Sequence, residues 1–302
     1  MYISEPEVHA LLTYEALIPA IRQALLDYSA GVVQQPPRTI LRAGNAEGES
    51  NGWFAVMPAI AGDVMGVKTV TFYPGNAALG LPTHQAVIEL LRRATGEPLA
   101  VLDGRLITEM RTAAVSAVAL DALAAKSVRS LGILGSGVQA HAHIRALRLV
   151  RPALEEIRLW SRTPSRAQTL AAETGGRAVA IEEAAAADVV LTVTSSPAPV
   201  LEGRWLAPHA LVLVGAVGAE RRELDDEAML SSCLIAESTA SLERESGDVL
   251  LSGARIYAEI GQILAGAVPA PVGRRIVFKS VGMAIEDLAA ARLVWAARQS
   301  AR

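Results

Sequence analysis

The sequence contains very little cysteine, and this scarcity limits the kinds of site that the chain can form. Cys233 is the single cysteine among 302 residues. It therefore cannot form a disulfide within the chain, and no cysteine cluster is present to bind a metal. We predict no metal site and interpret Cys233 as a small core residue. The absence of disulfides fits a reducing compartment such as the cytoplasm.

Long hydrophobic runs and an excess of charge of one sign are also missing. No apolar stretch approaches the roughly 20 residues needed to cross a bilayer, and Met1 is not followed by a basic segment and a hydrophobic signal core. We therefore expect a cytoplasmic protein without a membrane partner. The formal net charge is −3 at pH 7, with both signs mixed throughout, so we expect no nucleic-acid partner.

The chain has enough apolar residues for a large core, and its two parts differ in pattern. With 51% hydrophobic residues in 302, two domains are expected. Strand-like and helix-like runs alternate over residues 116–275, which predicts an α/β fold with a Rossmann-type doubly wound parallel sheet. Residues 1–115 are predicted to form an α+β domain. Residues 276–302 are predicted to form a turn and an amphipathic helix that returns to this α+β domain.

The α+β part carries several local signals. Ser4 and Glu7 have the spacing of a capping box at a helix start. WFAVMPA and VKTVTF are typical of strands, and Asp103-Gly104 indicates a hairpin turn. Thr83 is predicted to precede a helix, where its hydroxyl could act as the N-cap.

A glycine-rich stretch within residues 116–275 has the order strand, turn, helix. LGILGSGVQA ends its apolar run at Leu134, continues through Gly135 and Gly137, and then takes up helical spacing. Pyrophosphates bind backbone N–H groups at a helix N-terminus, where a Cβ on the turn would keep them away. The chain has 24 glycines, so the motif alone could be an ordinary loop. Its place after the first strand of the alternating series favours a dinucleotide site.

The end of the next strand bears on the choice of dinucleotide. An acidic residue there would bind the adenosine ribose and repel a 2′-phosphate, but the chain reads Ser161-Arg162-Thr163. A guanidinium with two hydroxyls favours a phosphate. We therefore predict NADP(H), with NAD(H) as the alternative. A solvated surface role for Arg162 would remove this preference.

Several long stretches together resemble the ornithine cyclodeaminase and mu-crystallin family. They include VKTVTFYPGN, AVLDGRLITEMRTAAVSA, LGILGSGVQA, ESGDVLLSGARIYAEIGQILAG and VFKSVGMAIEDLAAARL. The resemblance covers nearly the whole chain. It implies an NAD(P)-dependent enzyme acting on small α-imino or α-amino acids. It also implies a homodimer in which residues 1–115 carry substrate-binding and dimerisation contacts. The SRT and ESGDVLLSGA stretches resemble the mu-crystallin branch, which contains ketimine reductases.

The resemblance also implies which residues form the site. Arg38, Lys68, Arg111 and Val281 fall on substrate-binding positions, and Lys68 and Arg111 are expected to take part in catalysis. A guanidinium suits a substrate carboxylate because it can make two parallel hydrogen bonds, and we expect Arg111 to open a helix. Lys68 lies in an apolar strand, where its ammonium needs a partner unless it extends to the sheet edge. The cofactor-binding positions are Thr83, Arg111, Gly135, Gly137, Val138, Gln139, Ser161, Arg162, Thr163, Thr194, Val214, Ala216, Val217 and Ser280.

The proton donor is the least defined part of this predicted site. Family cyclodeaminases carry an aspartate in a loop that is shorter here, and Glu220 follows Gly218-Ala219 at this point. Glu220 is our catalytic candidate, with water as the alternative source of the proton. His84 could also donate a proton or serve in packing. Asp248 in ESGDV is interpreted as an exposed helix cap.

These observations predict an NAD(P)H-dependent reductase of small cyclic ketimine carboxylates of the pyrroline-2-carboxylate or piperideine-2-carboxylate type. One alternative is an ornithine cyclodeaminase with bound NAD, which converts ornithine to proline and ammonia. The other is a non-catalytic nucleotide- or ligand-binding protein of the mu-crystallin type. The basic residues Arg38, Lys68 and Arg111 argue against a purely binding role.

Overall fold

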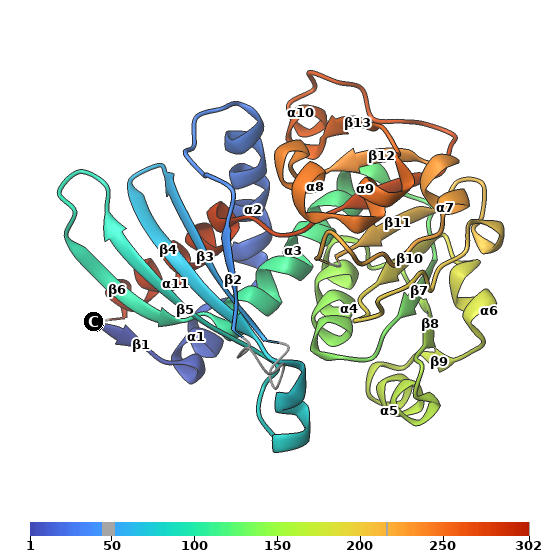
Figure 1. Cartoon of the computed structure of the whole chain (residues 1–302), viewed down its shortest axis with the longest axis horizontal. Coiled ribbons are helices and arrows are strands. Elements are labelled where there is room, and N and C mark those ends of the chain that lie inside the picture. The colour runs from blue at the N-terminus through green and yellow to red at the C-terminus, as the bar shows by residue number, and fades with distance from the viewer. Residues whose placement is uncertain (44–51, 216, 302) are drawn as a thin grey trace. The chain divides into compact units, whose positions relative to one another are not determined.

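A computed structural model describes residues 1–43, 52–215 and 217–301, which form two compact units (Figure 1). Unit 1 comprises Met1–Arg111 and Met283–Arg302, and unit 2 comprises Thr112–Gly282. Among the described helices, none has the length and apolar character that a membrane crossing requires.

Unit 1 contains a six-stranded sheet in the order β1-β6-β5-β4-β3-β2, antiparallel except for the β1–β6 pair. Its strands are β1 (Tyr2–Ile3), β2 (Thr39–Arg42), β3 (Trp53–Ala61), β4 (Val64–Phe72), β5 (His84–Arg92) and β6 (Pro98–Asp103). Its helical elements are α1 (Glu5–Leu11), α2 (Tyr14–Ser29), the 3₁₀ helix η1 (Pro74–Leu79), the start of α3 (Arg105–Leu123) and α11 (Ala284–Ser300). The predicted capping box is confirmed, because Glu7 accepts hydrogen bonds from both the backbone N–H and the hydroxyl of Ser4.

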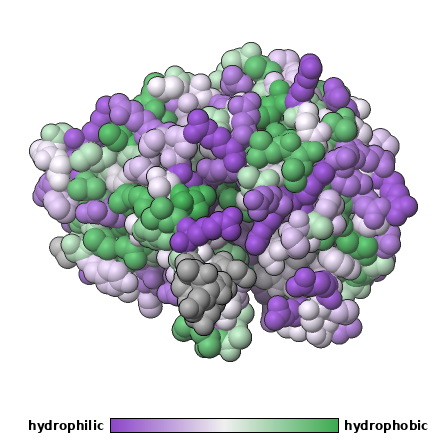
Figure 2. All heavy atoms as spheres, in the orientation of Figure 1, coloured by the Kyte–Doolittle hydropathy of each residue, from purple (hydrophilic) through white to green (hydrophobic). Residues whose placement is uncertain are grey.

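The two faces of this sheet have different surroundings. Side chains alternate between the faces along each strand. Lys68, Val70 and Ile88 are buried on the face that α11 covers, and α2 packs beside α11. The opposite face points toward the viewer in Figures 1 and 2, where hydrophobic side chains lie among polar ones. We call it the open face and define it by Tyr2, Val67, Thr69, Val87, Glu89 and Val101.

Two local predictions for unit 1 are wrong. Asp103-Gly104 joins strand β6 to helix α3 and makes no hairpin, because an Asp103 carboxylate oxygen accepts from the N–H of Arg105 at the helix start. A short polar residue followed by glycine suits a helix start as well as a tight turn. Thr83 precedes β5, an antiparallel partner of β4, and not a helix.

Unit 2 has the predicted Rossmann-type fold, with an eight-stranded parallel sheet in the order β13-β12-β14-β11-β10-β7-β8-β9. Its strands are β7 (Ser130–Leu134), β8 (Glu156–Trp160), β9 (Arg177–Ala178), β10 (Val189–Thr192), β11 (Leu211–Val214), β12 (Cys233–Ala236), β13 (Ile256–Glu259) and β14 (Ile276–Lys279). Its helices, besides the rest of α3, are α4 (Val138–Val150), α5 (Pro164–Thr174), α6 (Ile181–Ala185), η2 (Gly203–Trp205), α7 (Asp226–Leu230), α8 (Thr239–Glu245), α9 (Gly247–Ser252) and α10 (Ile260–Leu264).

The strand order creates a switch point beside the glycine turn. The chain runs outward from β7 through β8 to β9 and then returns to β10 on the other side of β7. Ligands of doubly wound sheets bind at such a point, outside the carboxyl ends of the strands. The central strands β7, β10 and β11 are buried along their whole length, as expected when helices cover both faces.

The expected turn after residue 276 is instead a strand. β14 lies between β11 and β12, and all four of its residues are buried. Its run of two β-branched residues and a phenylalanine is short enough that only its two parallel neighbours identify it as a strand. The observed units accordingly divide at 111/112 and 282/283, where we had placed the divisions at 115/116 and 275/276.

Candidate functional site

The glycine turn of unit 2 has the geometry of a phosphate cradle. Gly135 follows β7 with a φ of 127°, and a Cβ there would lie 2.5 Å from the carbonyl oxygen of Val193. Gly137 is the N-cap of α4, and a Cβ on it would meet no described atom within 4 Å. Its φ of −88° is ordinary for any residue. Gly135 is required by the fold itself, whereas Gly137 leaves clear space at a helix N-terminus.

The residues after β8 lie next to this turn. Leu134 pairs with Trp160, and the hydroxyl oxygens of Ser136 and Ser161 are 2.9 Å apart. Arg162 and Thr163 are exposed at the start of α5. The side chain of Val138 is 57% exposed and that of Gln139 is half-buried in the first turn of α4. The fold thus brings Gly135, Gly137, Val138, Gln139, Ser161, Arg162 and Thr163 together at one part of the sheet edge.

The remaining predicted cofactor residues of unit 2 follow neighbouring strands. Thr194 follows β10, and Ser280 follows β14, where its N–H donates to the carbonyl of Val214 at 2.9 Å. The Val214 side chain is buried in the core, and Val217 packs partly against the same core. Val281 is buried there as well, and its N–H donates to Glu237 at 3.1 Å. Ala216 lies outside the described residues.

The loop after β11 contains two glutamates whose environments differ. Glu220, our predicted proton donor, is exposed. Glu223 is fully buried and accepts hydrogen bonds from the hydroxyls of Thr192 and Thr194 at 2.9 and 2.6 Å. Burial raises the pKa of Glu223, opposed by Lys279 and by the hydrogen bonds from the two threonines. Sequence reasoning missed Glu223 because a glutamate in a charged run gives no sign of burial.

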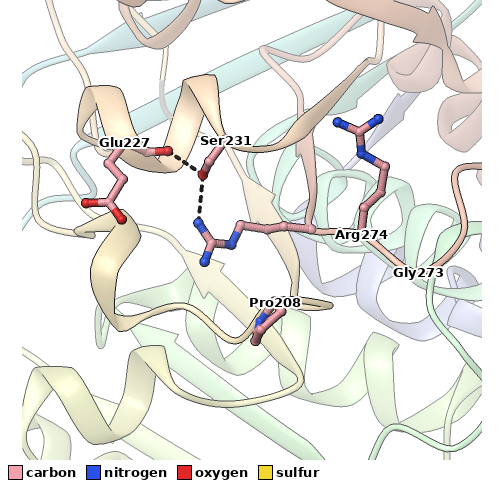
Figure 3. A pocket seen from close by; sticks show the side chains of 6 residues that line it. Pro208, Glu227, Ser231, Gly273 and Arg274 are labelled. Atoms are coloured by element: carbon pink, nitrogen blue, oxygen red, sulfur yellow. Dashed lines mark hydrogen bonds between the residues drawn. The ribbon is translucent and has the colours of Figure 1, made fainter.

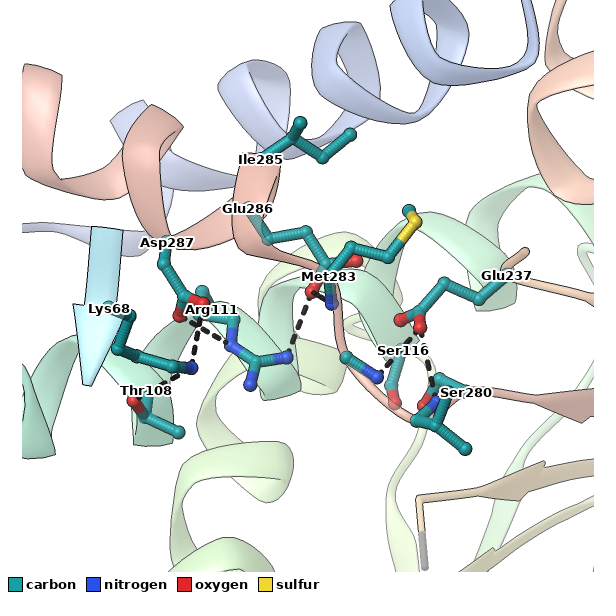
Figure 4. Close-up of polar contacts among 12 residues, drawn as sticks. Lys68, Thr108, Arg111, Ser116, Glu237, Ser280, Met283, Ile285, Glu286 and Asp287 are labelled. Atoms are coloured by element: carbon teal, nitrogen blue, oxygen red, sulfur yellow. Dashed lines mark hydrogen bonds and ion pairs between the residues drawn. The ribbon is translucent and has the colours of Figure 1, made fainter. Parts of the chain in front are cut away.

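Lys68 of unit 1 is buried in an ion pair. Its Nζ lies 2.6 Å from Asp287 Oδ2 on α11 and 3.4 Å from Thr108 Oγ1 on α3 (Figure 4). Burial lowers the pKa of Lys68 to about 8, although the Asp287 carboxylate raises it, and the charges of Arg111 and Arg38 lower it further. The alternative in which Lys68 extends to the sheet edge is therefore wrong.

Arg111 contacts two adjacent carboxylates at the start of α11, those of Glu286 and Asp287. Its Nε lies 3.1 Å from Asp287 Oδ1, and its Nη1 lies 2.8 Å from Glu286 Oε2 (Figure 4). Arg111 is in the second turn of α3 and does not open the helix, because α3 begins at Arg105. Asp287 therefore bridges the two cations that we predicted to hold the substrate.

These contacts join Lys68, Arg111, Glu286 and Asp287 in a buried cluster of unit 1. With Arg38, whose charge acts on Lys68, we call these residues the cation cluster. Arg38 is half-buried just before β2, and its charge contributes to the lowered pKa of Lys68. Three cations and two carboxylates leave this cluster with one positive charge when all five are ionised. Such a cluster complements a single carboxylate.

Thr83 and His84 occupy the beginning of β5 in unit 1. Thr83 is half-buried, and its carbonyl accepts from the N–H of Tyr73 at 2.8 Å. The His84 ring packs against Phe72, with ring centroids 4.5 Å apart. His84 thus has the packing role that we weighed against proton donation.

Sequence reasoning also missed Glu286 and Asp287 and misjudged Asp248. Acidic residues are ordinary in the first turn of a helix, so the pattern at the start of α11 gave no sign that both side chains would be fully buried. Asp248 is buried, not exposed, and forms an ion pair with Lys279 at 3.0 Å. Cys233 is buried as predicted.

Unit 2 also has an open depression of about 610 Å³ (Figure 3). It lies at the amino edge of the sheet, because its lining residues precede strands β11, β12 and β14. Arg275 there donates to Ser231 Oγ and to the carbonyl of Leu206, both at 2.7 Å. Those bonds join loops, so we assign this depression a structural role.

Comparisons with known proteins agree with this arrangement. The profile of the ornithine cyclodeaminase/mu-crystallin family matches residues 1–301. The mouse ketimine reductase mu-crystallin is 42% identical over 307 residues, covering 97% of this chain and 96% of the relative. The Δ1-pyrroline-2-carboxylate reductase of Thermococcus litoralis, solved with NADH and L-proline, is 31% identical with a TM-score of 0.93, covering 100% and 98% of the two chains. An archaeal alanine dehydrogenase dimer with NAD is 27% identical with a TM-score of 0.94, covering 100% and 96%.

Proposed function

This chain belongs to the ornithine cyclodeaminase/mu-crystallin family, and we propose that it is an NADPH-dependent reductase of small cyclic ketimine carboxylates. Substrates of the pyrroline-2-carboxylate or piperideine-2-carboxylate type fit this proposal. The observation that carries it is the cation cluster, which combines a net positive charge with the two basic side chains Lys68 and Arg111. Related reductases that act on such imines support the same substrate class.

The cation cluster would bind the carboxylate that these substrates carry beside the C=N bond. The Lys68 ammonium and the Arg111 guanidinium are both fixed by Asp287, so neither has to be ordered when the substrate arrives. Arg38 adds the third positive charge. Val281, buried in unit 2, completes the proposed set of substrate-binding residues.

The reduction adds a hydride to the imine carbon and a proton to the nitrogen. A bound nicotinamide supplies the hydride. The chain must orient the ring and deliver the proton, preferably before or during hydride arrival, because an iminium is the better acceptor. Glu220 is our candidate donor, and its exposure also allows a proton to pass from water through this carboxyl group.

The glycine turn and the residues around it suit a dinucleotide. Gly137 leaves space for a pyrophosphate at the N-terminus of α4, and Arg162 is exposed at the adjoining strand end. Because no acidic residue occupies positions 161–163, we propose that NADP(H) is preferred over NAD(H). The relatives solved with NADH and NAD support a nicotinamide cofactor, and the choice between NADP(H) and NAD(H) remains our proposal.

We also propose that two copies of the chain pair through the open face of unit 1. Val87 and Val101 are 45% and 37% exposed on this face, and Tyr2 is 61% exposed beside them. An antiparallel sheet can leave one face in water, but apolar side chains exposed together on that face are typical of an interaction surface. The dimer of the similar alanine dehydrogenase supports the same assembly state.

A substrate panel tests the proposed reaction. Pyrroline-2-carboxylate and piperideine-2-carboxylate are offered to the purified protein with NADPH, and ornithine and alanine are offered with NADP+ or NAD+, while absorbance of the reduced cofactor and ammonia are measured. Ketimine-dependent oxidation of NADPH is the expected result. Ammonia release from ornithine without net change in NADPH would identify a cyclodeaminase, and turnover of no compound would favour a binding protein.

A further inference from the structure

The ESGDV stretch that the proposed reaction leaves without a role lies against the loop after β11. The N–H of Gly218 donates to the carbonyl of Glu245 at 2.9 Å, and the N–H of Gly247 donates back to the carbonyl of Gly218 at 3.0 Å. A Cβ at Gly247 would collide with the carbonyl oxygen of Arg221. Only glycine allows the two segments to lie this close.

Asp248 then fixes the far end of the loop. Its Oδ1 accepts from the N–H groups of Glu223 and Leu224 at 2.8 and 3.0 Å, and its Oδ2 lies 3.0 Å from Lys279 Nζ. Asp248 is 1% exposed and Lys279 is 0% exposed. A carboxylate that accepts backbone N–H groups and pairs with a buried ammonium holds those groups in a single arrangement.

Glu223 extends this contact to the adjacent strand. One carboxylate oxygen accepts from the Thr192 hydroxyl, and the other accepts from both the N–H and the hydroxyl of Thr194. Asp248 therefore holds the backbone of Glu223, and the side chain of Glu223 holds Thr194. Thr194 is among the cofactor-binding residues that the family resemblance implies, and it follows β10 at the carboxyl edge of the sheet, where the nicotinamide of a doubly wound fold would extend.

Stability alone does not explain why Glu223, Asp248 and Lys279 are charged residues in a buried position. Buried charges lose hydration, and replacing a buried ion pair with apolar residues of similar volume is often neutral or stabilising. Their better-attested use is to specify one geometry among several. The loop between Gly218 and Leu224 has no helix or strand of its own, so its conformation depends on such contacts.

We propose that Glu223, Asp248 and Lys279 are positioning residues that fix the 218–224 loop and Thr194 for hydride transfer. This inference rests on the proposed reductase function. None of the three residues touches the substrate in our proposal. They act through Thr194 and through the loop that carries Glu220.

The first test separates positioning from cofactor affinity. Glu223→Ala removes the acceptors of Thr192 and Thr194, so we expect kcat with pyrroline-2-carboxylate to fall about tenfold or more while the Kd for NADPH changes less than about twofold. The deuterium isotope effect with 4-deuterated NADPH should increase, because a misaligned hydride transfer limits turnover more strongly. Glu223→Gln retains a carbonyl oxygen for Thr194 and should restore most of kcat.

The second test does not depend on activity. Trypsin can cleave after Arg221 and Arg222, which lie inside the loop. Both Glu223→Ala and Asp248→Asn should increase the cleavage rate there about tenfold or more, because local opening exposes the site. Glu227→Ala, an exposed glutamate on α7, is the matched control and should leave cleavage and kcat unchanged.

The outcomes distinguish the two proposals. If the native protein reduces ketimines but Glu223→Ala and Asp248→Asn keep the native kcat, isotope effect and cleavage rate, the positioning role is wrong and the reductase stands. A fall in melting temperature without those changes also overturns it. If the native protein reduces no ketimine, the reductase proposal fails together with the hydride-transfer role, whereas faster cleavage would still support the loop-fixing contacts.

Discussion

Arg111 is held by two buried carboxylates, and this determines which substitution can test it. Removing the guanidinium would leave Glu286 and Asp287 buried without this cation, which can cost about 3 to 5 kcal/mol of stability. Arg111→Lys keeps the charge but replaces a planar fork with one point of attachment. We expect kcat/KM for pyrroline-2-carboxylate to fall about tenfold or more, equivalent to about 1.4 kcal/mol, with the NADPH Kd little changed.

The control for Arg111 is 1-pyrroline, a cyclic imine without the carboxylate. It should be a poor substrate of the native protein and lose little more activity with Arg111→Lys. An equal loss for both compounds, or loss of NADPH binding, would make Arg111 a structural or cofactor residue.

Lys68 predicts a pH dependence of substrate binding. Burial lowers its pKa to about 8, so the ammonium that would hold a carboxylate is lost as the pH rises through that value. We therefore expect kcat/KM to decline above pH about 8 in the native protein. Lys68→Arg stays charged throughout this range and should not show this decline, whatever the effect of its different shape on the overall kcat/KM.

The imine nitrogen of the substrate titrates as well, so the measured quantity is the ratio of the native and Lys68→Arg profiles. Titration of the substrate affects both proteins equally and cancels in this ratio. A constant ratio from pH 6 to 10 would show that Lys68 does not need its proton.

Arg162 determines the proposed preference for NADP(H). A charge-assisted contact with the 2′-phosphate contributes about 1.5 to 3 kcal/mol, so kcat/KM for NADPH should exceed that for NADH by about tenfold or more. Arg162→Ala should remove most of this difference by weakening NADPH alone. Arg166→Ala, an exposed arginine on α5, the helix that follows Arg162, is the matched control. Equal use of both cofactors by the native protein would contradict the preference.

At the scale of elements, the two glycines of the turn between β7 and α4 have separable roles. A Cβ at Gly137 meets no described atom within 4 Å and the position needs no unusual φ, so we expect Gly137→Val to change the melting temperature little while NADPH binding is lost. Gly135→Ala needs a φ of 127° and approaches the Val193 carbonyl, so it should cost about 1 to 3 kcal/mol and lower the melting temperature by several degrees.

Calorimetry and fluorescence titration with NADPH measure the two effects on each variant. If Gly137→Val binds NADPH as tightly as the native protein, the turn between β7 and α4 does not bind the cofactor. An unchanged melting temperature in Gly135→Ala would show that the strained φ is not required.

At the scale of the whole molecule, the open face predicts a dimer that a single charge can weaken. Val87 lies on this face beside Thr69 of β4, so Val87→Arg should place a cation in the proposed interface and shift the protein toward a monomer. Sedimentation equilibrium measures this shift. Val272→Arg alters a valine that is 90% exposed in unit 2, outside the proposed interface, and should leave the assembly unchanged. A native monomer would contradict the prediction.

Much of the fold could be predicted because it depends on local patterns. The alternation of strand-like and helix-like runs in residues 116–275 indicated a parallel sheet, and the glycine turn fell at the expected place after β7. The errors arose where one local signal fits two structures. Asp103-Gly104 suits both a hairpin and a helix start, and the hydrogen bond from the Arg105 N–H to Asp103 identifies the second.

The sequence by itself determined the doubly wound unit, the glycine turn and the identity of the basic residues Arg38, Lys68 and Arg111, because residue type and spacing are sufficient for these. Only the tertiary structure decided their partners. Asp287 reaches Lys68 across more than 200 residues of chain, and Asp248 reaches Lys279 from a different element. Whether a carboxylate is buried beside a cation depends on which elements pack together, and the residue's own neighbours in the sequence do not encode that.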